Sequence, residues 1–262
     1  MMDDQVQPLE RLTVVVPVRD EEQRLASTLD HIRLAMDRAQ SARRGARLVV
    51  VLDACTDGSA RIAASAAQTD PRIRVITSDA GCVGIARSRG VAAALAGSPG
   101  PRLHRHWIAN TDADTRVPPE WLEVSADAAD AGIDALIGTV EPDALELGSH
   151  RHAAWQALHV RHEGHPHVHG ANLGVRASAY LRAGGFPPLP EDEDVRLVEA
   201  LRSHGAVVRS SGRLHAVTSG RLQGRVDHGF AGYLAHLPDE EGAPGALHPS
   251  TTECMDTAGR RT

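Results

Sequence analysis

The sequence contains no lysine, so all 28 of its basic side chains are arginines. Any mechanism that needs a lysine is therefore excluded. Cysteine is also scarce: the three residues Cys55, Cys82 and Cys254 are odd in number and widely spaced. That pattern predicts neither a disulfide framework nor a four-cysteine zinc site.

Long apolar runs and a basic excess are missing too. No stretch approaches the roughly 18 apolar residues of a membrane-spanning helix, and the opening "MMDDQVQPLERL" lacks the basic and apolar regions of a signal peptide. A formal net charge of -6 and a pI of about 6.2 argue against nucleic acid as the main partner. With 42% hydrophobic and 24% charged residues, we expect a soluble, cytoplasmic globular protein. The sequence does not indicate its oligomeric state.

What the chain does have is a regular alternation over its first 110 residues or so. Apolar runs at 12–16, 48–52 and 73–76 predict buried strands, the first of them ending before Pro17. A polar turn and a helical pattern follow each run, and a fourth run covers 107–109. This alternation predicts an α/β fold with a parallel sheet and right-handed crossovers.

Two carboxylates, Asp112 and Asp114, directly follow the fourth predicted strand. In an extended segment they would point the same way, at the sheet edge where open α/β folds keep their ligand crevice. Such a pair suits Mg²⁺ or Mn²⁺, and the cation would carry a phosphorylated ligand with it. The alternative is a polar turn before Pro118 and Pro119.

Two further polar segments have both a structural and a functional interpretation. Glycines surround Arg87 and Arg89 at a predicted helix start, where a diphosphate could approach the backbone; a solvated helix face is the alternative. The four acids at 191–194 could serve a helix dipole, or one of them could be a general base with a raised pKa.

Taken in order, the motifs resemble the family-two glycosyltransferases of the GT-A fold. The segments that carry the resemblance are "VVVPVRDEE", "VLDACTDGSA", "GCVGIARSRG", "NTDAD", "HGANLGVRASAYLRAGGF" and "PEDEDVRLVEALRSHG". The resemblance covers about residues 12–214. It implies one GT-A domain at 1–237, a Rossmann-like, mostly parallel sheet with helices on both faces. Its nucleotide-binding half would span about 11–115 and its acceptor half about 116–237.

The resemblance also implies roles for individual residues. The nucleotide would contact Pro17, Val18, Arg19, Glu21, Asp53, Arg87 and Asp112. Asp112 and Asp114 would hold the metal, and the sugar and acceptor would lie against His169, Gly170, Asn172 and Glu191. Glu193 and Asp194 are carried over as the catalytic pair, with Asp194 as the base. The second motif departs from the family pattern, since Ala54 stands where a second acid usually follows Asp53.

Histidines and the chain end complete the set of expectations. The histidine-dense stretch 150–169 could hold zinc, but its spacing matches no closed ligand set, and Trp155, Leu158 and His162 suggest one side of a helix. In related transferases a loop histidine sometimes completes the metal shell, which makes His215 and His228 candidates. Residues 238–262 are polar and are expected to be disordered.

The sequence therefore predicts a metal-dependent transferase that moves a sugar from a nucleoside diphosphate, uridine favoured over guanosine, to an acceptor hydroxyl. With Asp194 as base the reaction would be inverting. Three alternatives remain open: a retaining transferase of the glucosyl- or mannosylglycerate type, a sugar-nucleotide pyrophosphorylase, and a non-catalytic nucleotide-binding module.

Overall fold

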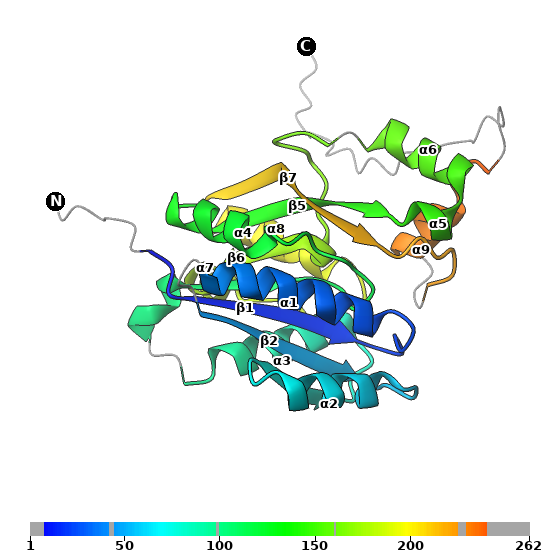
Figure 1. Ribbon diagram of the computed structural model, residues 1–262. Coiled ribbons are helices and arrows are strands. Elements are labelled where there is room, and N and C mark those ends of the chain that lie inside the picture. The colour runs from blue at the N-terminus through cyan, green and yellow to red at the C-terminus, as the bar shows by residue number, and fades with distance from the viewer. Residues whose placement is uncertain (1–7, 42–44, 98–99, 160, 225–228, 240–262) are drawn as a thin grey trace, which may run out of the picture.

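The computed structural model describes residues 8–41, 45–97, 100–159, 161–224 and 229–239. Within them, strands and helices alternate along the chain (Figure 1). The strands are β1 (Arg11–Val18), β2 (Gly45–Asp53), β3 (Ile73–Ser78), β4 (His106–Asn110), β5 (Ala135–Pro142), β6 (Leu173–Arg176) and β7 (Val208–Thr218). The helices are α1 (Leu25–Ser41), α2 (Ser59–Thr69), α3 (Val83–Leu95), α4 (Trp121–Asp130), α5 (Ala144–Leu147), α6 (Ser149–Leu158), α7 (Ala177–Arg182), α8 (Glu193–Ser203) and α9 (Phe230–Ala235).

The strands form one sheet in the order β3-β2-β1-β4-β6-β5-β7. β1, β2, β3 and β4 are parallel, as predicted, and β5 is parallel to β7 at the far edge. Only β6 runs antiparallel to its neighbours β4 and β5. Because of this reversal, Leu173 at the start of β6 pairs with Asn110 at the end of β4. The segment before β6 therefore lies beside the carboxyl ends of the other strands.

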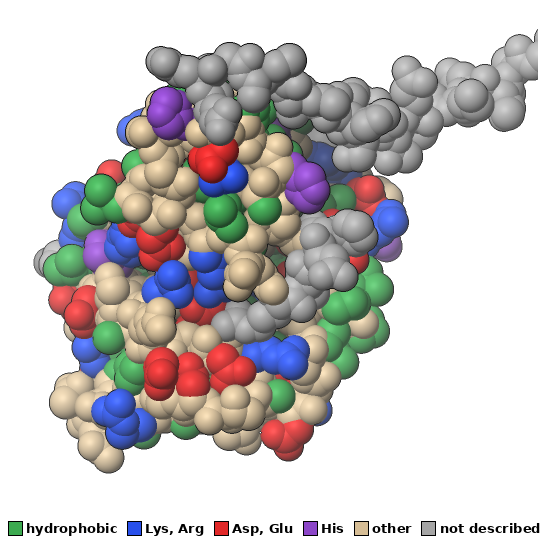
Figure 2. All heavy atoms as spheres, turned by 90° about the vertical axis from the view of Figure 1, so that its right-hand side faces the viewer, with side chains coloured by type: hydrophobic (Ala, Val, Ile, Leu, Met, Phe, Trp, Pro, Cys, Tyr) green, Lys and Arg blue, Asp and Glu red, His purple; other side chains and the backbone are tan. Residues whose placement is uncertain are grey.

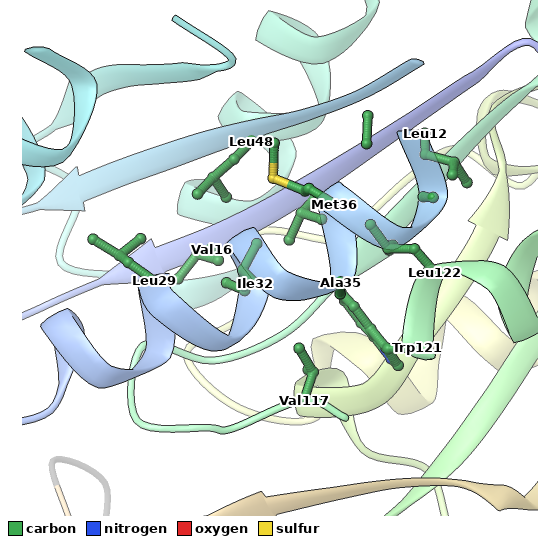
Figure 3. Packing of buried hydrophobic residues seen from close by; sticks show 14 of the residues in the cluster. Leu12, Val16, Leu29, Ile32, Ala35, Met36, Leu48, Val117, Trp121 and Leu122 are labelled. Atoms are coloured by element: carbon green, nitrogen blue, oxygen red, sulfur yellow. The ribbon is translucent and has the colours of Figure 1, made fainter. Parts of the chain in front are cut away.

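Helices cover both faces of the sheet. One core cluster joins α1, α2 and α4 to one face, and a second joins α3, α7 and α8 to the other. In the first cluster, Ile32 and Met36 of α1 pack with Val16 of β1 and Leu48 of β2 (Figure 3). Strand side chains alternate between faces, so neighbouring Val15 belongs to the second cluster. The continuous apolar runs in the sequence reflect this burial on both sides.

The first strand is longer than its sequence predicts. β1 continues through Pro17 to Val18 instead of ending before the proline. Proline lacks the N–H that a central strand needs, but β1 pairs with β4 only as far as Val15 opposite Asn110. Beyond that point β1 keeps only its β2 neighbour, where Pro17 is opposite Val51. Pro17 therefore lies in a part of β1 that has only one neighbouring strand with which to form backbone hydrogen bonds.

The helix expected to include Trp155, Leu158 and His162 is shorter than predicted. α6 ends at Leu158, whose side chain is exposed, and His162 lies beyond it. Trp155 alone of the three is buried, against Leu147, Leu234 and Leu237. None of the helices described is long and apolar enough to cross a membrane.

Gly90 provides a test of the packing between α3 and the sheet. A Cβ atom there would lie 2.4 Å from Val15 Cγ1 and 2.9 Å from Val51 Cγ2. Gly90→Ala should therefore lower the free energy of unfolding by about 1–3 kcal/mol, despite the better helix propensity of alanine. Gly100→Ala is the matched control, since a Cβ there meets nothing within 4 Å. Equal urea midpoints for the two variants would contradict this close packing.

Candidate active site

A cavity of about 490 Å³ opens at the carboxyl ends of the strands. Acidic and arginine side chains gather around the hollow on this side of the molecule (Figure 2). Among the described residues, the cavity is lined by eight acids and three arginines: Glu21, Asp53, Asp112, Asp114, Glu191, Asp192, Glu193, Asp194, Arg19, Arg87 and Arg221. Pro17, Val18, His169 and Gly170 also line it. The structure thus brings most of the sequence-predicted site residues together.

Asp112 and Asp114 meet in the cavity, but not through an extended segment as the sequence argument assumed. β4 ends at Asn110, and the Thr115 amide donates to the Asp112 carbonyl at 3.2 Å, which closes a turn. Thr218 Oγ1 donates to the Asp114 carboxylate at 3.3 Å. Burial, followed by the charge of Asp112, raises the pKa of Asp114 to about 6. A carboxylate with poor access to water and a second carboxylate in the same cavity need a cation beside them.

Arg87 supplies one such cation from inside α3. Its Nη2 lies 2.5 Å from Asp112 Oδ1 and its Nε 2.9 Å from Glu193 Oε1. The side chain is only 2% exposed, and its Nη1 has no hydrogen-bond partner among the described residues. Burial lowers the pKa of Arg87, but the carboxylates around it outweigh that effect and raise it. Arg89, in contrast, is exposed, so the solvated helix face is the correct interpretation for Arg89 and the wrong one for Arg87.

A second guanidinium comes from a position to which the sequence analysis gave no role. Arg221, in the loop after β7, lies 3.0 Å from Asp114 Oδ2 and 2.7 Å from Glu21 Oε1. Glu21 is itself buried, and its backbone amide donates to Ser59 Oγ at 2.8 Å. Neither spacing nor composition signals this pairing, because Arg221 and Glu21 meet only when β7 joins the sheet beside β5, with its carboxyl end at the same edge of the sheet as that of β1.

The acids at 191–194 differ in the contacts that they make. Glu193 is buried against Arg87, whereas Asp194 faces the cavity and accepts hydrogen bonds from the Gly170 and Val195 amides. Burial raises the pKa of Asp194 to about 6, with a further rise from Glu193. Glu191 lines the cavity but makes no described hydrogen bond to these groups.

Asp53 is used by the protein itself. Its carboxylate accepts hydrogen bonds from the Ser78 hydroxyl at 2.6 Å and from the backbone amides of Ala80, Gly81 and Cys82. Both oxygens therefore hold the loop that leads into α3. Although Asp53 lies on the cavity wall, its main contacts differ from the nucleotide contact expected for it.

Asn172 is not a cavity residue, in contrast to the expectation from sequence. Its amide donates to the carbonyls of Thr139 and Leu214 and accepts from Trp121 Nε1, all at 2.9–3.0 Å. Both N–H donors are used within the protein and the side chain is fully buried, so Asn172 joins β5, β7 and α4. His169 does line the cavity, and burial together with nearby histidines lowers its pKa to about 3. His169 is therefore neutral at pH 7.

Of the two candidate metal histidines, His215 is not brought to the aspartate pair. His215 is bonded through Nδ1 to Thr139 and through Nε2 to Glu141, and it does not line the cavity. His228 lies outside the described residues. In the part of the chain that the structure describes, no group of three or more His, Cys, Asp and Glu side chains could hold a metal ion, which also removes support for zinc in the histidine-dense stretch.

Asp112 and Asp114 nevertheless fit a hard divalent cation. Mg²⁺ is commonly held by one or two carboxylates and completes its shell with water and substrate phosphate oxygens. The carboxylate pair here supplies such ligands, and Arg87, which also lines the cavity, has a buried Nη1 without a hydrogen-bond partner among the described residues. The two carboxylates already bind positive charge, because Asp112 is paired with Arg87 and Asp114 with Arg221.

Comparison with known proteins gives the family. Residues 13–179 match glycosyl transferase family 2. The match covers well over half of the sequence, and the chain therefore belongs to this family, which confirms the resemblance found in the sequence. A comparison with curated proteins found no match.

Solved structures agree on the fold. The mannosyltransferase of Pyrobaculum calidifontis, in complex with GDP-Man and Mn²⁺, has a TM-score of 0.59 at 21% identity over 84% of this chain and 60% of that one. GalNAc-T7 with UDP, GalNAc and Mn²⁺ has a TM-score of 0.60 at 12% identity, over 84% of this chain and 46% of that one. Glucosyl-3-phosphoglycerate synthase of Mycobacterium tuberculosis with UDP has a TM-score of 0.53 at 13% identity, over 83% of this chain and 74% of that one. This chain therefore spans less than two thirds of the length of the first two proteins. The GT-A fold is confirmed.

The bonds of Asn172 lead to a stability prediction. Asn172→Ala leaves the buried Trp121 Nε1 without its partner and removes one hydrogen bond from each of two buried carbonyls, and the free energy of unfolding should fall by about 2–4 kcal/mol. Gln156→Ala removes a single hydrogen bond made by an exposed side chain and should change the free energy of unfolding by less than about 0.5 kcal/mol. Urea denaturation compares the two. A stable Asn172→Ala protein would reopen a role for Asn172 in ligand binding.

Proposed function

We propose that this glycosyltransferase needs a divalent cation to transfer a sugar from a nucleoside diphosphate to an acceptor hydroxyl. The observation that carries the proposal is the charge of the cavity, where eight carboxylates outnumber three guanidiniums among the described residues. A diphosphate adds further negative charge, so it can enter such a cavity only together with positive charge. A divalent cation on Asp112 and Asp114 provides that charge next to the free donor of Arg87.

The chain's own residues then have separate tasks. When bound, Mg²⁺ or Mn²⁺ acts as a Lewis acid that neutralises charge on the departing diphosphate. Pro17, Val18 and Arg19 on the β1 side would contact the nucleotide, and His169 and Glu191 would contact the sugar or acceptor, because all of them line the cavity. Arg87 is fixed by Asp112 and Glu193 and offers its remaining Nη1 to the diphosphate.

Asp194 is the proposed general base. Its pKa of about 6 leaves it ionised at neutral pH while making it a stronger proton acceptor than an ordinary aspartate. The Gly170 amide fixes one carboxylate oxygen. Glu193, expected as part of the catalytic pair, is instead a positioning residue, since its carboxylate is buried on Arg87. A direct displacement assisted by Asp194 inverts the anomeric carbon.

A retaining reaction is the second candidate. It is kept because the sequence leaves a retaining transferase of the glucosyl- or mannosylglycerate type open, and the fold is similar to that of glucosyl-3-phosphoglycerate synthase of Mycobacterium tuberculosis in complex with UDP. The anomeric configuration of the product, measured by NMR early in the reaction, separates the two mechanisms. Among donors, we place uridine diphosphate sugars first and guanosine diphosphate sugars second, and a cytoplasmic location remains our expectation.

Donor binding should depend on metal. With Mn²⁺ present, a nucleoside diphosphate at about 100 times its Kd should add about 2.7 kcal/mol of stability, which raises Tm by several degrees. With EDTA the shift should disappear, because the carboxylates then repel the ligand. Asp112→Asn should weaken the shift with Mn²⁺. An equal shift in EDTA would contradict the metal site at Asp112 and Asp114.

Asp194→Asn should keep donor binding but slow turnover by about 10²–10⁴-fold, because the amide cannot accept the proton. In the unaltered enzyme, kcat/KM should fall as pH decreases through about 6, where Asp194 becomes protonated. Asp37→Asn is the control, since Asp37 is a surface partner of Arg72 and does not line the cavity. A near-normal rate for Asp194→Asn would leave the transfer intact but remove Asp194 as its base.

A further inference from the structure

The two arginines beside the aspartate pair are held in different ways. Arg87 projects from the middle of a helix, is 2% exposed and lies between two carboxylates. Arg221 projects from a loop, and its side chain is 26% exposed. The first guanidinium is thus enclosed by the protein, whereas the second reaches solvent.

Arg221 occupies the open side of Asp114. Its Nη2 is 3.0 Å from Asp114 Oδ2, and its Nη1 is 2.7 Å from Glu21 Oε1. Both carboxylates are nearly inaccessible to water, with side chains 12% and 4% exposed. The guanidinium therefore supplies the positive charge that two buried anions require, in contact with an oxygen that a divalent cation would also take.

The backbone around Arg221 is fixed. Ser219 Oγ and the Gly220 amide both donate to Glu146 Oε2, at 2.6 and 2.9 Å. A Cβ at Gly220 would lie 2.5 Å from the Asp143 carbonyl, so the loop is also packed tightly against the start of α5. Movement of the Arg221 guanidinium therefore requires only its side-chain torsions.

We propose that Arg221 is the resident counter-ion of Asp114, which gives way to the divalent cation and then binds the diphosphate. This inference rests on the proposed function. A cation entering alone must break the contact between Arg221 and Asp114 and leaves the guanidinium with Glu21 in place of two carboxylates, so the cation binds weakly. When a nucleoside diphosphate enters with the cation, the displaced guanidinium gains phosphate oxygens in place of carboxylate oxygens. Cation and nucleotide consequently bind cooperatively, with a coupling free energy that depends on Arg221.

The test measures Mn²⁺ binding without any turnover. Free Mn²⁺ is quantified by its EPR signal at pH 8, above the pKa of Asp114, with and without UDP. Arg221→Met keeps an apolar stem and removes the charge. Its affinity for Mn²⁺ alone should rise about tenfold, or about 1.4 kcal/mol, and the enhancement of Mn²⁺ binding by UDP should fall by at least about tenfold. Unchanged or weaker binding of Mn²⁺ alone would overturn the proposal.

Two variants control for charge and folding. Arg33→Met removes an ion-paired arginine that is also 26% exposed, outside the cavity, and should leave Mn²⁺ binding unchanged. Arg221→Lys keeps a cation and should keep Mn²⁺ binding weak. If Arg221→Met does not fold by circular dichroism, Arg221→Gln replaces it with the same expected result.

The failures of the two proposals are distinguishable. If UDP does not enhance Mn²⁺ binding to the unaltered protein, the proposed function is contradicted. If UDP does enhance it, but Arg221→Met shows the same Mn²⁺ affinity and the same enhancement, the metal-dependent site stands and the role of Arg221 is wrong.

Discussion

The cavity depends on the buried ion pairs of Arg87. This one guanidinium joins α3, the turn after β4 and the start of α8, because it contacts Asp112 and Glu193, which are 25 and 106 residues away in sequence. Taking the charges of Arg87 and Glu193 out of water is costly, and removal of one partner would leave an uncompensated charge in the interior. The arrangement therefore constrains where the N-terminal strands and the later helix can lie relative to each other.

The sheet supplies the second constraint. Parallel strands place their carboxyl ends at one edge, so acids that are far apart in the sequence, such as Glu21, Asp53 and Asp112, reach the same cavity. β6 runs the other way and brings its amino end to that edge, which is how Gly170 comes close to Asp194. Without the reversal of β6, the stretch before it would lie at the opposite end of the sheet.

Much of this could be predicted from the sequence, and the exceptions have physical reasons. Period and composition locate β1 to β4 and their helices, since burial on both faces leaves continuous apolar runs. The motif order gives the family, and most of the site residues that it predicts line the cavity. The sequence predicts ligand contacts for Asn172 and Asp53 and does not reveal their hydrogen-bond partners within the protein. Those partners, Leu214 for Asn172 and the Ser78–Cys82 loop for Asp53, are set by tertiary structure alone. Arg221 was given no role for the same reason, as it meets Glu21 200 residues away.

Gly170 shows how packing and chemistry meet at one residue. A Cβ there would lie 2.6 Å from Arg87 Nη2 and 3.2 Å from Asp194 Oδ2. A side chain at this position would push the guanidinium away from Asp112 or the carboxylate away from the Gly170 amide. The glycine thus permits Arg87, on the side proposed for the diphosphate, and Asp194, the proposed base, to lie close together. Asn172, two residues further along, holds the same backbone in place through its three buried hydrogen bonds. The short segment before β6 thus does more than line the cavity with His169, because Gly170 also lets Arg87 and Asp194 lie close together.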